Sequence, residues 1–265
     1  MSVSFDMTLR EDILTARDTQ QDKHTIAEKY HEKRVKTIRE DGGPYNADGD
    51  SGLVVHIVDS AAFESGSEYR LSEIDEPYNS IPILSNPYSG GRGQGDTVKH
   101  TASGPGVATT ANEDDIVRRY THIANVGIVE ATTLDIVASG EHGQVDGLHI
   151  GASTLEGILV ERTARIMNVI DNADVGGPYS ITFTLWGVSG VQFIYRGDGM
   201  PMFGTTAFEA DTIAPFGTEV ESAIDPVELR DALAEPLSSL WQAAGYDSPE
   251  TYTDGEWEIA DDLGL

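Results

Sequence analysis

The stretch Pro178–Arg196, PYSITFTLWGVSGVQFIYR, constrains the fold most, because it alternates apolar and polar residues on both sides of a glycine-bearing turn. Ile181, Phe183 and Leu185 share one face of an extended segment, and the period of two returns at residues 191–195. This pattern predicts a central β-hairpin. Helical patterns precede and follow it, so we expect a sheet packed against helices.

Other segments predict further strands and one long connection. Leu53–Val58, LVVHIV, is a continuous apolar run typical of a buried strand, and His56 within it is expected to be a core histidine. Residues 120–137 offer two strands, and residues 211–220 offer one more. Residues 76–115 are rich in glycine and proline, which predicts a long irregular loop with short strands near residues 81–84.

Three segments have the pattern of helices. From about Leu9 to Glu40 the chain contains no glycine or proline, and its second half is amphipathic. Ser153–Glu156 matches a capping box, which predicts a helix that runs to about Asp171. The sequence Asp225-Pro-Val-Glu228 supplies an N-cap and a proline at the first helical position, and Pro236 should kink or divide that helix.

These elements predict an α+β fold, in which helices cover a mostly antiparallel sheet and an N-terminal amphipathic helix is added. We expect an N-terminal helical arm at residues 1–41, a strand- and loop-rich half at 42–140, and a helix, hairpin, strand and helix half at 141–265. The two halves could equally form one continuous domain. A chain of 265 residues is long enough to bury a full core.

The charge of the chain is extreme and uneven. It carries 45 acidic and 17 basic side chains, which give a net charge of −28. Dense surface carboxylates repel one another in dilute buffer, and molar salt removes that penalty, so the composition predicts a salt-adapted protein whose stability requires salt. The alternative is an acidic mimic of nucleic acid or a binder of basic partners.

Residues 1–40 differ from this acidic body because they hold eight basic and eight acidic side chains. On the N-terminal helix the cationic face could contact a partner, or it could contact the acidic body of its own chain. Direct binding of nucleic acid by this face is a further alternative, although phosphate contacts weaken steeply with salt. The partner-facing candidates are Lys29, Lys33, Lys36 and Arg39.

Two arginines fall on faces that are otherwise apolar. Arg162 lies within a helical stripe of leucine, isoleucine and valine, and Arg34 lies beside Ala27 and Ile38. A charge on a core-facing stripe must be paired or must extend to the solvent. Glu130 follows a mostly apolar run and could accept either arginine, as a structural ion pair or as part of a site for an anionic ligand.

Motifs for common catalytic chemistry are absent. The sequence contains no HExxH, GxSxG or GxxxxGK[ST] pattern, and it has no cysteine, which excludes disulfides and thiol nucleophiles. His142, Asp146 and His149 are a weak candidate for a zinc or iron site. Asn46, Asp48 and Asp50 resemble the start of a calcium loop, but the required glycine and glutamate are missing, so we predict a simple connector.

Several short motifs carry a resemblance to a known family. They are the helix Tyr30-His-Glu-Lys-Arg34, the strand LVVHIV at 53–58, NVGIVE at 125–130, SITFTLWGVSGV at 180–191, and Leu240-Trp-Gln-Ala-Ala-Gly-Tyr246 with Gly255-Glu-Trp257. In order and spacing these resemble the region that follows the N-terminal domain of Schlafen-like, Alba-type DNA-binding and ATP-binding proteins of bacteria and archaea. The likeness covers most of the chain.

The resemblance implies a detached accessory module. In that family the nucleotide or nucleic-acid activity is attributed to the Alba-type domain, which we expect this chain to lack, so no catalytic residue and no cofactor carry over. We therefore expect a non-enzymatic interaction module of a salt-adapted cytosol, acting with a protein partner or as a homo-oligomer in nucleic-acid handling or antiviral defence. The alternatives are a metal-dependent hydrolase or nuclease at His142, Asp146 and His149, and direct nucleic-acid binding through the N-terminal helix.

Overall fold

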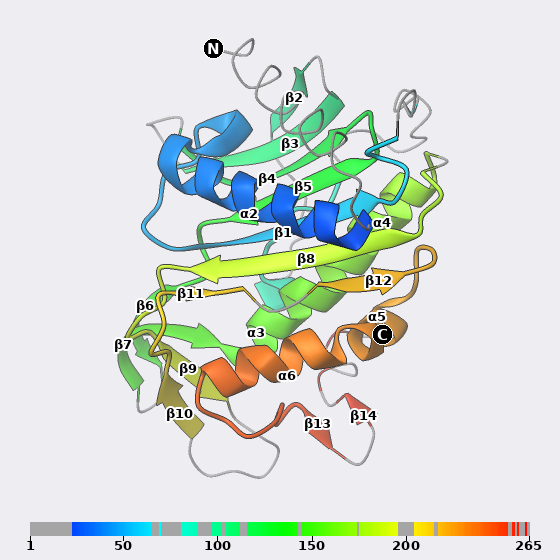
Figure 1. Ribbon diagram of the computed structural model, residues 1–265. Helices are drawn as coiled ribbons and strands as arrows, with labels where there is room; N and C mark the ends of the chain where they lie inside the picture. The colour runs from blue at the N-terminus through cyan, green and yellow to red at the C-terminus, as the bar shows by residue number, and fades with distance from the viewer. Residues whose placement is uncertain are drawn as a thin grey trace.

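The computed structural model describes residues 23–64, 69, 81–89, 97–101, 104–111, 116–142, 145–173, 175–195, 204–214, 217–253, 256–257, 259 and 263. Its helices form layers on the two faces of an antiparallel sheet (Figure 1). Helix α2 (Lys23–Asp41) crosses one face, and the helical run of α3 (Ala152–Gly157) and α4 (Thr163–Asp171) lies behind the other (Figure 1). The α+β fold and the N-terminal helix expected from the sequence are therefore present, although residues 9–22 lie outside the described part.

The main sheet has the order β11-β8-β1-β5-β4-β3-β2, and β12 also pairs with β8. Strands on either side of residue 140 belong to it, because β8 pairs with β1 along its whole length. The strands are β1 (Gly52–Asp59), β2 (Thr97–Thr101), β3 (Gly104–Ala111), β4 (Ile116–Ala124), β5 (Ile128–Thr133), β8 (Tyr179–Trp186), β11 (Thr212–Ile213) and β12 (Thr218–Val220).

A second, smaller sheet has the order β10-β9-β7-β6, in which β7 and β9 run parallel. Its strands are β6 (Ala138–His142), β7 (Val145–Gly151), β9 (Gln192–Tyr195) and β10 (Gly204–Ala207), and β13 (Tyr252–Thr253) pairs with β14 (Glu256–Trp257) nearer the C-terminus. The predicted hairpin at 178–196 is wrong in its pairing. Both strands exist, but β8 joins the main sheet and β9 joins the second one.

Strand β1 is buried along its whole length because both of its faces are covered. Leu53, Val55 and Ile57 belong to the largest apolar cluster of the core, on the side of α3 and α4. Val54 and Val58 belong to clusters that include residues of α2. The continuous apolar run in the sequence therefore reflects a strand between two helical layers, as predicted.

The helices behind the sheet begin and end largely as expected. Helix α3 (Ala152–Gly157) continues through a π-helical turn (Ile158–Arg162) into α4 (Thr163–Asp171). Asp225 caps α5 (Pro226–Ala232) by accepting hydrogen bonds from the amides of Val227 and Glu228, both at 2.9 Å. A break at Leu233 separates α5 from α6 (Ala234–Ala243), close to the predicted division. Short 3-10 turns occupy η1 (Gly43–Tyr45) and η4 (Pro87–Ser89).

Two local predictions fail for physical reasons. The capping box at Ser153 does not form, because the N-cap of α3 is Gly151, two residues earlier, and makes no side-chain hydrogen bond, while Glu156 is buried in the core. Part of the loop expected at 76–115 is the antiparallel pair β2 and β3. Pro105 is the second residue of β3 and lies before the register with β4 begins at Gly106, so its missing backbone donor interrupts no pairing with β4.

Candidate functional site

A buried polar network between α2 and the main sheet is centred on Arg34 and Glu130, two residues that the sequence singled out. Arg34 has no exposed surface, and its guanidinium donates to Glu130 Oε2 from Nε at 2.8 Å and to Oε1 from Nη2 at 3.1 Å. A bidentate contact of this kind fixes both position and orientation. It ties the middle of α2 to β5.

Two histidines extend the network. His56 of β1 lies opposite Glu130 in the strand register, and its Nε2 is 3.0 Å from Glu130 Oε2. His31 of α2 places its Nδ1 2.6 Å from His56 Nδ1, and its Nε2 2.7 Å from the hydroxyl of Thr184 on β8. The result is a continuous chain of polar contacts from β8 through α2 and β1 to β5.

Burial and charge determine the protonation of this chain. Burial lowers the pKa of His31 well below its usual value, and the neighbouring His56 lowers it further. Burial also lowers the pKa of His56, although its hydrogen bond to Glu130 opposes the shift. For Glu130 burial alone would raise the pKa, but the Arg34 guanidinium and His56 lower it well below its usual range. The resting network therefore contains an ionised Glu130 and two neutral imidazoles.

Tyrosines close the network on the side of β4. The hydroxyl of Tyr120 donates to Glu130 Oε1 at 2.9 Å, so both carboxylate oxygens are engaged. Tyr45 of η1 lies with its hydroxyl 3.1 Å from His122 Nδ1. Burial raises the pKa of both tyrosines, and the charge of Glu130 raises it further, so both phenols remain protonated.

The order hydroxyl, imidazole, imidazole and carboxylate resembles the relay that activates a hydroxyl nucleophile. Thr184, which would be the nucleophile, is only 2% exposed beneath α2. A substrate cannot reach it while α2 remains docked. In the described conformation the chemistry of this network is therefore that of a structural clasp between helix and sheet.

The second arginine, Arg162, does not contact Glu130. It is 2% exposed, and its Nε lies 3.2 Å from the carbonyl oxygen of Ser85 and 3.2 Å from Glu161 Oε2. Glu161 also pairs with Arg165. Arg162 therefore connects the π-helical turn with the 81–89 segment, while Arg34 alone of the two candidate arginines meets Glu130.

A second buried carboxylate was missed by the prediction from sequence. Glu156 of α3 is fully buried and accepts hydrogen bonds from the indoles of Trp241 (2.6 Å) and Trp257 (3.0 Å) and from the Thr251 hydroxyl (2.7 Å). Burial raises its pKa, and these hydrogen bonds oppose the shift. The capping-box spacing misled the prediction for Glu156. The signal that could have found it is the pair Trp241 and Trp257, because a buried indole N–H needs a hydrogen-bond acceptor.

The outer face of α2 carries the proposed partner-facing side chains. Lys29, Lys33 and Lys36 are all exposed, and Lys36 lies 3.9 Å from Glu40 on the same face. Arg39 is engaged by its own chain, because its guanidinium contacts Asp211 at 3.3 Å and the Thr212 hydroxyl at 3.0 Å. Arg39 therefore fastens the end of α2 to β11, and Lys29, Lys33 and Lys36 form the exposed basic surface of the helix.

The structure does not assemble a metal site from the described residues, among which no group of three or more suitable ligands is found. Asp146 is exposed on β7, His149 is buried on the same strand, and the side chain of His142 lies outside the described part. The connector with Asn46, Asp48 and Asp50 has all three side chains exposed.

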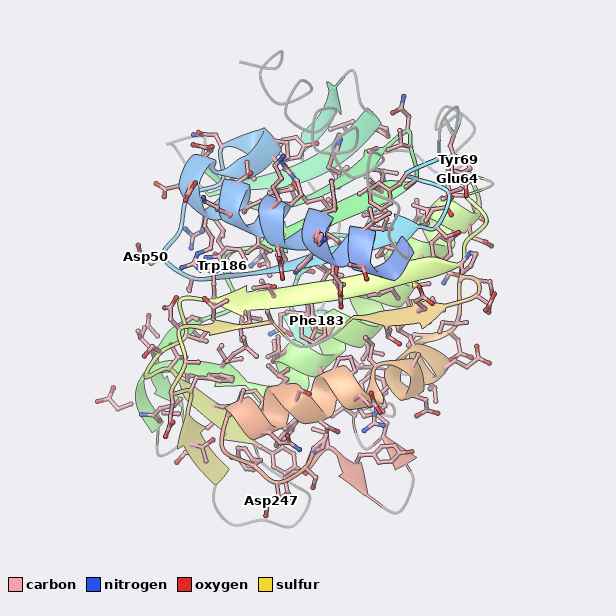
Figure 2. The ribbon with its side chains drawn as sticks, in the orientation of Figure 1. Asp50, Glu64, Tyr69, Phe183, Trp186 and Asp247 are labelled. Carbon is pink, nitrogen blue, oxygen red and sulfur yellow. The ribbon has the colours of Figure 1, made fainter. Side chains whose placement is uncertain are left out.

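A cavity of about 380 Å³ lies where that connector meets the end of α2. Its wall includes acidic side chains (Glu40, Asp41 and Asp48) together with Leu134 and Trp186. Figure 2 shows Trp186 at the end of β8, close to the C-terminal end of α2. No residue of the network belongs to its wall, so the cavity does not open onto Thr184.

Comparison of the chain with protein-family models, with curated proteins and with solved structures found no match. Among the described helices, none combines the length and the apolar character that crossing a lipid bilayer would require. The site must therefore be interpreted from its own geometry.

Proposed function

We propose that the chain is a non-enzymatic protein-interaction module, and that it presents the outer face of α2 to an acidic protein partner. The observation that carries this proposal is the division of α2 into two polar faces. The inward face, with His31 and Arg34, is consumed by contacts to the sheet. The outward face exposes Lys29, Lys33 and Lys36, which are three of the five lysines in a chain of net charge −28.

Charge supports an acidic partner at this face. A body with 41 acidic residues outside α2 repels another acidic protein from most directions, whereas α2 has six basic and four acidic residues. Complementary charge suppresses wrong orientations and favours one docking geometry. In the salt-adapted cytosol that we propose for this chain, screening over about 3 Å restricts such attraction to close contact pairs.

The resemblance to Schlafen-like proteins is the reason for placing that partner in nucleic-acid handling or antiviral defence. Nucleic acid would then be contacted through the partner. Direct binding by α2 is disfavoured because molar salt opposes counterion release and the rest of the chain is strongly anionic.

The test uses the scarcity of lysine. We would purify the chain with its partner from the native cell in molar salt and treat the complex with a carbodiimide, which joins amines directly to carboxylates. We expect cross-links between Lys29, Lys33 or Lys36 and acidic residues of the partner. Partner cross-links that avoid α2 entirely would contradict the proposal.

Two matched triple variants sharpen this result. Changing Lys29, Lys33 and Lys36 to arginine keeps the charge and should preserve co-purification. Changing the same residues to glutamate should abolish it while the melting temperature stays within a few degrees. Unchanged binding by the glutamate variant would overturn the proposal. Stoichiometric zinc or iron in the purified chain, together with nuclease or phosphatase turnover, would instead support the hydrolase alternative at His142, Asp146 and His149.

A further inference from the structure

We propose that His31 and His56 form a proton-operated latch, in which proton uptake by the pair releases α2 from the sheet and so withdraws its basic outer face from the partner. The biological meaning of this latch rests on the proposed function of α2. Its physical basis concerns only the contact between α2 and the sheet, and it can be tested without any partner.

The geometry permits one proton between the two rings. The Nδ1 atoms of His31 and His56 face each other at 2.6 Å, so one of them must donate and the other must accept. Both rings are buried, at 6% and 0% exposure, and water cannot substitute for a lost contact without an opening of the interface. Whether this hydrogen bond can form therefore depends on how many protons the two rings carry.

When both rings are neutral, every hydrogen bond of the network can form, with each donor pointing from Thr184 toward Glu130. Ionised Glu130 can only accept, so His56 must carry its proton on Nε2 and donate it to Oε2. His56 Nδ1 is then bare and accepts from His31 Nδ1–H. His31 Nε2 is bare in turn and accepts from the Thr184 hydroxyl. The contacts thus assign opposite tautomers to the two histidines.

One added proton reverses this chain, and a second one breaks it. If His56 becomes an imidazolium, it donates from both nitrogens, and His31 donates from Nε2 to Thr184 Oγ1. A second proton places an N–H on each Nδ1, so two donors and two positive charges oppose each other across 2.6 Å. Because no hydrogen bond can join two donors, the doubly protonated pair is incompatible with docked α2.

The surrounding groups leave the histidines as the proton-sensitive part of the interface. Arg34 opposes protonation of His56, while Glu130 favours protonation of both rings. The bidentate contact between Arg34 and Glu130 balances these two charges. The other ionisable side chains described beside the pair or its carboxylate are Tyr30 of α2, Tyr45 of η1, and Tyr120 and His122 of β4. His122 lies opposite Glu130 in the strand register and contacts the Tyr45 hydroxyl. Burial raises the pKa of Tyr45 and of Tyr120, so these two phenols stay neutral.

The sign of the pH dependence follows from burial. A released histidine has a pKa of about 6.5, and in the docked state burial holds the pKa of His31 and of His56 below that value. The docked state is therefore fully favoured above about pH 6.5, and it loses stability as the pH falls through the window between 6.5 and the lowered values. With two protons taken up, the opening constant should rise by up to about 100-fold per pH unit.

Hydrogen exchange of the full chain in molar salt, between pH 5 and 8, tests the latch. After correction for intrinsic exchange, amides of α2 should show the steep increase in opening below pH 6.5. Amides of α4 provide the internal control, because α4 packs on the apolar face of the sheet. Parallel behaviour of α2 and α4 across the whole range would overturn the latch.

The variant His56→Gln supplies the matched test, since its amide can still donate to Glu130 and accept from His31. We expect the steepest pH dependence of α2 opening to fall to about tenfold per pH unit, because one titrating group is gone. A slope equal to that of the wild type would contradict the proposal.

Nitrogen-15 imidazole spectra of the wild type give a second measurement that needs no variant to fold. At pH 8 they should show His31 protonated on Nδ1 and His56 on Nε2, and the opposite tautomers or a charged ring would refute the latch. These results are independent of the partner. Cross-links that avoid α2 at neutral pH would overturn the proposed function alone, and failure of the exchange test would overturn the latch alone.

Discussion

The two faces of the main sheet are built from the same strands but have different chemistry. Behind the sheet, β1 and β8 contribute leucine, valine, isoleucine and phenylalanine side chains to the apolar core, and Figure 2 marks Phe183 midway along β8. Toward α2 the alternate positions of the same strands carry His56, Thr182 and Thr184, and β5 adds Glu130. The face toward α3 and α4 is apolar, whereas the face toward α2 combines apolar contacts with specific polar ones.

The difference matters because the two kinds of contact respond to different perturbations. Apolar burial is non-directional and hardly depends on pH. A buried polar network stabilises only when all its members are satisfied, and it fixes orientation as well as proximity. We infer that the polar contacts of the α2 face set the register of α2 and make its docking depend on pH, while the apolar contacts of the opposite face hardly depend on pH.

The largest expected effect comes from removing the charge at the centre of the network. Glu130→Ala leaves Arg34 and His56 buried without their acceptor, and breaking one partner of a buried pair costs about 3–5 kcal/mol. Chemical denaturation in molar salt measures this loss. The exposed carboxylate Glu40 is the control, and its replacement by alanine should change the free energy of unfolding by less than about 0.5 kcal/mol.

A double variant separates the charge from the space it fills. Arg34→Met with Glu130→Leu replaces the ion pair by apolar side chains, so it should recover part of the stability lost in Glu130→Ala. Recovery stays incomplete because His56 Nε2 still lacks its acceptor. A double variant less stable than Glu130→Ala would show that the ion pair stabilises the fold by more than the free-energy cost of burying its two charges.

The second prediction compares the buried carboxylates Glu130 and Glu156. Arg34 lowers the pKa of Glu130, whereas Glu156 accepts hydrogen bonds from neutral donors and burial raises its pKa. Glu130 therefore contributes stability above about pH 4.5 that is lost on acidification, and Glu156 contributes stability at low pH that is lost as the pH rises through its raised pKa. A tenfold change in the acid dissociation constant of either carboxyl on folding corresponds to about 1.4 kcal/mol of stability.

A carbon-13 titration of the glutamate carboxyl groups measures both pKa values directly. Glu130 should remain ionised below the usual midpoint, and Glu156 should titrate above it. Displacement of both pKa values in the same direction would mean that burial, and not the partner, controls both groups. The charged contacts of the α2 face and the neutral contacts around Glu156 would then have the same effect on a buried carboxylate.

Much of the secondary structure could be predicted, because local signals set it. The Asp225 cap, the break before Pro236 and the buried strand β1 each follow from a few neighbouring residues. The pairing of β8 and β9 could not be predicted in the same way. A period of two identifies a strand but not the strand with which it pairs. In the structure β8 pairs with β1 along its whole length, and not with β9.

The candidate site was predictable only in part. A charge on an apolar stripe identified Arg34 and Arg162, and Glu130 was named as a partner for either of them. The choice of Arg34 depends on α2 crossing β5, which is tertiary information. His31 and Thr184 carried no local signal, because a polar residue that faces a buried polar partner has the same sequence pattern as one that faces water.

The third prediction concerns Arg162, on the helical layer behind the sheet. Arg162→Ala removes a donor to the Ser85 carbonyl oxygen but leaves Glu161 paired with Arg165. We expect a loss of about 1–3 kcal/mol, smaller than for Glu130→Ala, since no charge is left uncompensated. Thermal scans in molar salt measure it, with the half-exposed Arg165→Ala as the control at below about 1 kcal/mol. A larger loss than that of Glu130→Ala would reverse the ranking of the two layers.

A smaller effect distinguishes two threonines on the same face of β8. Thr184→Val removes the hydroxyl that donates to His31 Nε2, and an unsatisfied buried acceptor costs about 1–3 kcal/mol. Thr182 Oγ1 is buried and has no hydrogen-bond partner among the described residues, so Thr182→Val should be neutral or stabilising. The comparison is matched in strand, face and volume. Equal effects of the two changes would show that the network does not extend to Thr184.

The smallest expected effect lies on the outer face of α2, where function is proposed. Lys36 and Glu40 approach only to 3.9 Å and are 72% and 61% exposed, so Lys36→Gln should alter the free energy of unfolding by less than about 0.5 kcal/mol. Denaturation in molar salt checks this, with Lys36→Arg as the charge-preserving control. Because the inward face of α2 carries the structural contacts, charge changes on the outer face should affect partner binding without affecting the fold. A loss above about 1 kcal/mol would show that both faces of α2 stabilise the protein, and the charge-reversed variants would then report on folding as well as on recognition.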